Sequence, residues 1–220
     1  MRHWNVSCLV AGLLALSSAA SAATFTFNTD PFAGTTALTT PGRQVIANEQ
    51  FITFNIATDL FVLDPTVFNT GNTVEFANAP VAAIPAVPLN VVVLDSFDND
   101  NNPATPFGAP QAANLIAGKM TVAGPGFFIY FNQTLDVPRL VFSTDLSSTA
   151  SDLKVLARLT NLSGQAGRDA MPNFTAANFS FTSADGTGAP EPGSFGLIAG
   201  GALLVVCGRF SRRKRAGRKS

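Results

Sequence analysis

The sequence predicts an all-β fold, a β-sandwich over residues 23–185, between two end segments of different composition. Three observations predict it: short runs in which apolar and polar residues alternate, turn-forming residues at close intervals, and no helical stripe longer than a few turns. From the spacing of the runs we expect about eight to ten strands. An open β-barrel is the alternative arrangement of such strands.

Alternating runs predict strands that bury one face, because successive side chains of a strand point to opposite sides of its sheet. Such runs are TFTF from Thr24, QFITFNIA from Gln50 and LKVLARLT from Leu153. In the third run Leu156 interrupts the otherwise polar face.

Two further runs, Val91–Leu94 and Phe127–Phe131, are apolar on both faces and predict central strands. The turn sequence of residues 123–126 predicts a hairpin that joins LIAGKMTV to FFIYFN. Three prolines make Ala79–Leu89 an extended linker or a sheet edge.

The amino-terminal segment, residues 1–22, predicts a signal peptide. Arg2 supplies the cation, Cys8–Leu16 the short apolar stretch, and Ala20-Ser21-Ala22 the small residues of a cleavage site. We expect cleavage after Ala22, with a slip to Ala23 as the alternative. The apolar stretch is too short for a stable membrane anchor.

The composition of the segment 23–185 argues against several classes of function. It holds 13 acidic and six basic side chains, a net charge of −7, which argues against a nucleic-acid partner. Every Cys, His and Trp of the chain lies outside this segment, at Cys8, Cys207, His3 and Trp4. The segment therefore has no Ser-His-Asp triad, no Cys-His pair and no histidine-bound zinc. We expect it not to be an enzyme.

The carboxy-terminal segment has three parts in a fixed order. Residues 186–193 form a flexible spacer that contains Pro190, Glu191 and Pro192, and these prolines impose an extended backbone. Residues 194–210 carry no charge apart from Arg209 and would span about 24 Å as a single transmembrane helix. Residues 211–220 form a basic tail, expected to stay in the cytoplasm.

This three-part ending resembles the PEP-CTERM sorting signal, found on exported proteins of Gram-negative bacteria that make exopolysaccharide. The matching residues are Pro190, Glu191 and Pro192, then Phe195–Cys207, then the basic stop of Arg212, Arg213, Lys214 and Arg215. Stretches such as VVVLDSFDNDNNPATPFGAPQAANLIAG also resemble the bodies of PEP-CTERM proteins of unassigned activity, which supply no catalytic residues to transfer.

The resemblance implies processing by an exosortase, after signal peptidase has removed the leader. The protein would be held briefly in the inner membrane, facing the periplasm, and then reach the cell surface or the extracellular matrix. Exopolysaccharide is a possible partner there. A permanently anchored single-pass envelope protein is the alternative, since a basic stop after an apolar helix orients such an anchor equally well.

A polar cluster in LDSFDNDNNP suggests a second kind of function. Asp95, Asp98 and Asp100 offer hard oxygen ligands at close spacing, which suit Ca²⁺, although the sequence departs from the EF-hand pattern. A solvated loop of Asx turns is the other interpretation. If Ca²⁺ binds there, a Ca²⁺-assisted carbohydrate-binding module is the alternative function.

Carboxylate-dependent glycoside hydrolysis is a third hypothesis, because it needs only two acidic side chains. The available carboxylates are Asp59, Asp64, Glu75, Asp95 and Asp98. Sequence spacing does not predict which of them lie near one another.

Overall fold

The computed structural model describes residues 21–97 and 107–183 and shows a mostly β fold with two sheets. Within these residues there are ten strands, as many as the upper end of the expected range. They are β1 (Thr24–Phe27), β2 (Val45–Ile46), β3 (Gln50–Ile52), β4 (Leu60–Leu63), β5 (Phe76–Ala79), β6 (Val91–Leu94), β7 (Gly126–Asn132), β8 (Val137–Ser143), β9 (Leu153–Leu159) and β10 (Phe179–Phe181).

The short helices of the described residues lie between these strands. They are α1 (Pro65–Phe68), α2 (Ala109–Ala117) and α3 (Gly164–Ala170), with the 3₁₀ turns η1 (Val81–Ala83), η2 (Met171–Asn173) and η3 (Ala176–Asn178).

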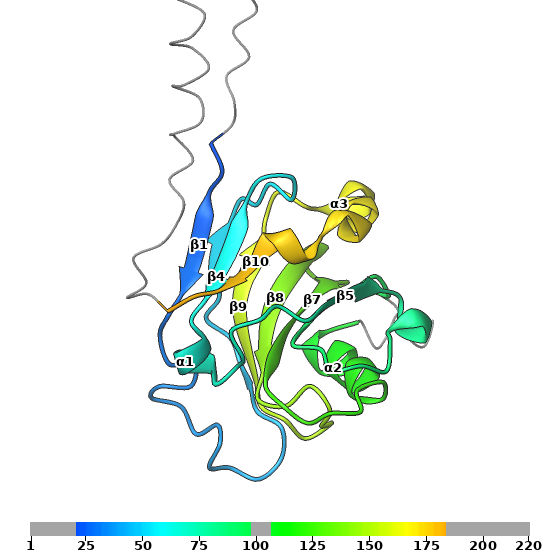
Figure 1. The fold of residues 1–220 in the computed structure, drawn as a ribbon. Coiled ribbons are helices and arrows are strands. Elements are labelled where there is room, and N and C mark those ends of the chain that lie inside the picture. The colour runs from blue at the N-terminus through cyan, green and yellow to red at the C-terminus, as the bar shows by residue number, and fades with distance from the viewer. Residues whose placement is uncertain (1–20, 98–106, 184–220) are drawn as a thin grey trace, which may run out of the picture. The chain divides into compact units, whose positions relative to one another are not determined.

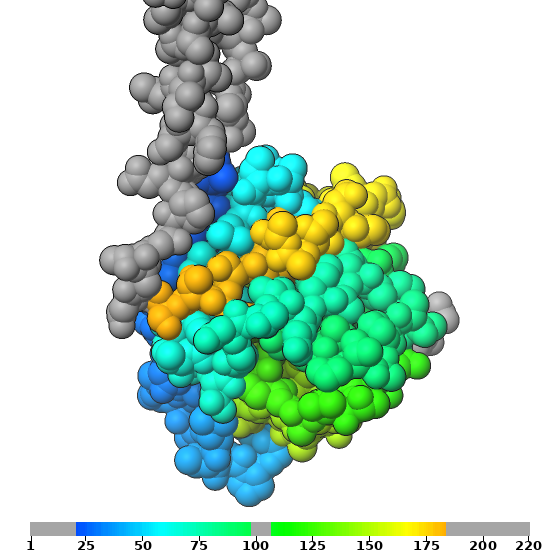
Figure 2. All heavy atoms as spheres, viewed as in Figure 1, coloured from blue at the N-terminus to red at the C-terminus, as the bar shows by residue number. Residues whose placement is uncertain are grey.

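The smaller sheet has the order β1-β4-β10, with both outer strands parallel to β4. Figure 1 shows the three strands side by side, coloured blue, cyan and orange. The first and last strands of the described chain therefore flank the same central strand. In Figure 2 the orange segment of β10 lies across the surface, between the cyan and teal segments.

The larger sheet has the order β2-β9-β8-β7-β6-β5, and β3 also pairs with β9. Only the pairs β7–β8 and β8–β9 are antiparallel; β5, β6 and β7 run parallel, as do β2 and β3 with β9. The two runs that are apolar on both faces, β6 and β7, lie inside this sheet and are fully buried, as expected. β5 is an edge strand of this sheet. The prediction of an extended linker or a sheet edge for Ala79–Leu89 is wrong in part, because Val81–Ala83 form the 3₁₀ turn η1.

The expected hairpin at residues 123–126 is wrong. LIAG belongs to α2, and β7 pairs with β6 and β8 instead. Because β6 and β7 are parallel, the chain must cross over between them, and α2 lies in that crossover. Its buried residues recur at helical spacing: Ala109, Ala112, Ala113, Ile116 and Ala117. Pro110 fits the first turn, where no intrahelical N–H bond is lost.

Two apolar clusters cover the opposite faces of the larger sheet. The first lies between the two sheets, where Phe61 of β4 packs with Phe179 of β10, and Phe181 of β10 packs with Phe127 of β7. Within it the rings of Phe54 and Phe61 stack with centroids 4.2 Å apart. The second lies between the larger sheet and α2. The larger sheet is therefore the middle layer of the described fold.

An irregularity in β9 explains why Leu156 interrupts its alternation. Val141 faces Val155 while Leu140 faces Ala157, so Leu156 is an extra residue in the ladder. The alternation therefore reverses at this point. Leu153 and Val155 point toward α2, whereas Ala157 and Leu159 point toward the smaller sheet. The prediction of one buried face for β9 is wrong, since both of its faces carry buried residues.

The chain divides into two units, Met1–Ala184 and Asp185–Ser220. No residue of the second unit belongs to the part of the chain that the structure describes. Within the described residues no helix is long and apolar enough to cross a membrane. The expected span, residues 194–210, the sorting motif and basic stop, and nearly all of the expected signal peptide lie outside them.

Candidate functional site

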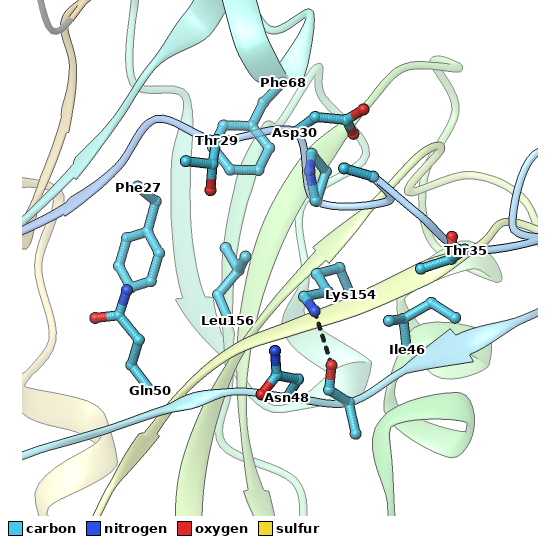
Figure 3. Close-up of a pocket in the computed structure, with 13 residues that line it drawn as sticks. Phe27, Thr29, Asp30, Thr35, Ile46, Asn48, Gln50, Phe68, Lys154 and Leu156 are labelled. Carbon is cyan, nitrogen blue, oxygen red and sulfur yellow. Dashed lines mark hydrogen bonds between the residues drawn. The ribbon is translucent and has the colours of Figure 1, made fainter.

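A pocket of about 370 Å³ is lined by residues of β1 and the segment after it, of α1, of the segment from β2 to β3, and of β9 (Figure 3). Phe27, Phe68 and Leu156 form its apolar floor. The extra residue in β9 thus contributes directly to the pocket. A wider hollow of about 650 Å³ near Phe54 has no charged side chain in its lining.

Lys154 is the cation of this pocket. Its Nζ donates to the carbonyl oxygen of Ala47 at 2.7 Å, the dashed line in Figure 3. No ion pair of Lys154 occurs within the described residues, so its remaining N–H donors are available to a ligand. Burial lowers the pKa of Lys154, and the charge of Glu49 opposes that effect.

Neutral polar side chains also line this pocket. Thr29 comes from the segment after β1, Asn48 comes from the segment between β2 and β3, and Gln50 is the first residue of β3. Among the described residues no hydrogen bond engages these three side chains. Asp30 also lines the pocket, but its Oδ1 accepts from the N–H of Phe32 at 2.9 Å, and Figure 3 shows its carboxylate turned away from Lys154.

Asn48 has a backbone conformation that non-glycine residues rarely adopt, with φ of 78°. Such a conformation costs about 1 kcal/mol or more and persists only where the surroundings hold it. β2 and β3 both run parallel to β9, and the three residues between them, 47–49, stand opposite only two residues of β9, Val155 and Leu156. The segment with this extra residue brings Asn48 to the pocket and Glu49 to Arg139 and Arg158.

Glu49 is held by two arginines on the α2 side of the larger sheet. Its Oε1 accepts from Arg139 at 2.8 Å and from Arg158 at 2.6 Å. Burial raises the pKa of Glu49, but the hydrogen bond from Arg158 and the charges of both arginines outweigh it and leave the pKa below its ordinary value. The ring of Phe51 covers the Arg158 guanidinium at 4.7 Å. Glu49 therefore pairs with both guanidinium groups and fixes the backbone beside the pocket, although Nε of Arg139 is buried without a hydrogen-bond partner.

The expected calcium ligands are only partly within the described residues. Asp95 follows β6, and its Oδ1 is buried without a hydrogen-bond partner. Burial raises the pKa of this carboxyl group. Asp98 and Asp100 lie outside the described residues. Among the residues described, no three Asp, Glu, Cys or His side chains gather in a way that could hold a metal ion.

Two pairs of the carboxylates considered for glycoside hydrolysis can be placed from the strands that they flank, and in neither pair do the two residues lie close together. Asp59 and Asp64 stand at opposite ends of β4, roughly 16 Å apart along the strand. Glu75 precedes β5 and Asp95 follows β6; since these strands are parallel, the two residues also lie at opposite ends. A glycosidase needs a separation of about 5 to 9.5 Å.

Comparisons of the chain with family models, with curated proteins and with solved structures found no match.

Sequence reasoning missed the pocket, because its residues come from β1, the β2–β3 segment and β9, which are far apart in the chain. One signal was present: Leu156 breaks the alternation of its strand, and it lines the pocket next to Lys154.

Proposed function

We propose that this protein is exported, sorted through its carboxy-terminal segment, and delivered to the cell surface or an exopolysaccharide matrix, where it has a structural, non-catalytic role. The observation that carries the proposal is the order of Pro190-Glu191-Pro192, the apolar residues 194–210 and the Arg212–Arg215 stop, behind a signal peptide at 1–22. Its processing enzymes are a signal peptidase and an exosortase.

The described fold is compatible with removal of that segment. The last strand, β10, ends at Phe181, before the spacer of residues 186–193 begins. Both strands that flank β4 are therefore retained after cleavage near Pro190. We propose that the body is a β-sandwich to which α2 adds an outer layer.

Mass spectrometry of the mature protein tests the sorting proposal. We expect a carboxy terminus near Pro190–Pro192 and no peptides from residues 212–220. Glu191→Ala should leave full-length chain in the inner membrane, whereas Glu75→Ala, at an exposed site in the body, should be processed normally. A surface form that still carries Arg212–Ser220 would support the permanent-anchor alternative instead.

Polysaccharide binding is a second candidate function, favoured by the unpaired Lys154 among free hydroxyl and amide groups. This combination suits a hydroxylated ligand that bears a carboxylate, of about the size of one acidic sugar residue. Full-length protein in detergent can be titrated with D-glucuronate and with D-glucose, which lacks the carboxylate. We expect saturable binding of glucuronate, weakened about tenfold by Lys154→Met and unchanged by Lys119→Met.

The calcium-assisted form of this candidate rests on the unpartnered Oδ1 of Asp95. It predicts that polysaccharide binding falls when a chelator is added, and that Asp98→Ala with Asp100→Ala reproduces this loss. Binding that is insensitive to the chelator would leave Lys154 as the determinant and would exclude a role for Ca²⁺.

A further inference from the structure

The carboxylate of Asp59 holds the beginning of the described fold. Its Oδ1 accepts from the backbone N–H of Ala23 at 2.9 Å, and its Oδ2 from the N–H of Asn55 at 2.8 Å. The hydroxyl of Thr58 also donates to Oδ1, at 3.0 Å. In return, the carbonyl oxygen of Ala23 accepts from the N–H of Leu60 at 2.9 Å. Ala23 is therefore fixed through both of its backbone polar groups.

This carboxylate is buried, with 6% of Asp59 exposed, yet it has no ion pair within the described residues. Burial raises its pKa, but the hydrogen bonds from Asn55, Ala23 and Thr58 outweigh that effect and leave the pKa below its ordinary value. No charged side chain contributes to the shift. An ionised group in such a position is normally paired with a cation.

Cleavage of the signal peptide would supply that cation. Hydrolysis of the Ala22–Ala23 peptide bond adds water, leaving a carboxylate on Ala22 and an amino group on Ala23. An α-amino group is largely protonated at neutral pH. The atom that donates to Asp59 as an amide in the precursor becomes an ammonium nitrogen in the mature chain.

We propose that Asp59 is the built-in counter-ion of the mature amino terminus, so that processing after Ala22 creates an ion pair between the Ala23 ammonium and the Asp59 carboxylate. The inference rests on the proposed export. The ion pair requires cleavage after Ala22, because a chain beginning at Thr24 lacks the nitrogen that reaches Asp59 and the carbonyl that binds Leu60. Signal peptidase acts on the translocating chain, and the ion pair forms as the body folds.

The test begins with the full chain expressed with its own leader and recovered after export. Mass spectrometry of the amino-terminal peptide should identify Ala23 as the first residue. The rate of acetylation of this amino group is then measured against pH for the native protein. The ion pair predicts a titration midpoint above that of an ordinary α-amino group. Burial alone would move the midpoint downward, so the direction separates the two effects.

Asp59→Asn should remove the upward shift and raise the acetylation rate near pH 7 about tenfold. The matched control is Asp169→Asn, at an exposed aspartate, which should behave as the wild type. Should Asp59→Asn fail to fold, the wild type alone still tests the inference. The titration midpoint of its amino group in the native protein is then compared with the midpoint in the urea-unfolded protein. An ordinary or lowered native midpoint, or a mature chain that begins at another residue, overturns the inference. Neither result bears on the sorting proposal, which is tested at the other end of the chain.

Discussion

Arg139 and Arg158 face each other directly across β8 and β9, and both donate to the same oxygen of Glu49. Two neighbouring guanidinium groups repel each other, and Glu49 is the carboxylate that makes their proximity favourable. It lies between β2 and β3, so the pairing also fastens the edge of the larger sheet.

Glu49→Gln should destabilise the fold by about 2 kcal/mol. Loss of one member of a buried ion pair costs about 3 to 5 kcal/mol, and the partial exposure of both arginines reduces this. Urea denaturation of the variant and the wild type measures the difference. Glu75→Gln makes the same change at an exposed glutamate and should be nearly neutral. Equal midpoints for the Glu49 variant and the wild type would contradict the assigned role.

The contribution of Glu49 should disappear in acid. Its pKa in the folded state lies below the ordinary value of 4.5, so its stabilisation is present above about pH 4.5 and is lost as the pH falls through the folded pKa. A protonated Glu49 resembles glutamine. The stability difference between the wild type and Glu49→Gln should therefore shrink between about pH 5 and pH 2. A difference that stays constant over this range would show that the charge of Glu49 is not involved.

Gly126→Ala should be strongly destabilising. A Cβ at Gly126 would lie 2.7 Å from the carbonyl oxygen of Asn90 and 2.5 Å from Cδ1 of Leu146. The backbone of Asn90 cannot yield easily, because its carbonyl accepts from the N–H of Phe127. We expect a loss of about 2 to 3 kcal/mol in thermal or urea unfolding. Gly124→Ala, which meets no atom within 4 Å, is the control and should change stability little.

Arg43→Lys should lower stability although it keeps the charge. The guanidinium of Arg43 donates to the carbonyl oxygens of Pro110, Ser148 and Ser151 and to the side chains of Asn114 and Ser151. It thus ties α2 to two loops, and an ammonium group cannot reach all these acceptors at once. We expect a loss of about 1 to 2 kcal/mol. Asn114→Ala removes one acceptor and should cost less; the reverse ranking would contradict this account.

How far the sequence predicted the site depends on the range of the interactions involved. The acidic loop at Asp95 was visible because its residues are adjacent in the chain. The contacts of Asp59 were not visible, because they come from distant segments of the chain. Ala23 donates to its side chain, and Asn178 donates to its backbone carbonyl oxygen. The Lys154 pocket was missed for the same reason, since sequence neighbours alone do not bring Thr29 and Asn48 to it.

The sequence by itself determined the two strands that are apolar on both faces, β6 and β7, the acidic character of the body and the three-part composition of the carboxy-terminal segment, whereas it did not show the buried strand β8. These properties depend on residue types and on periods of two to a few residues. Only the tertiary structure decided that most strand pairs are parallel, that LIAG is helical, and that β9 changes face at Leu156. Strand direction and ladder register depend on which distant segments pack together to fill the core. Alternation within one strand carries no information about its partner.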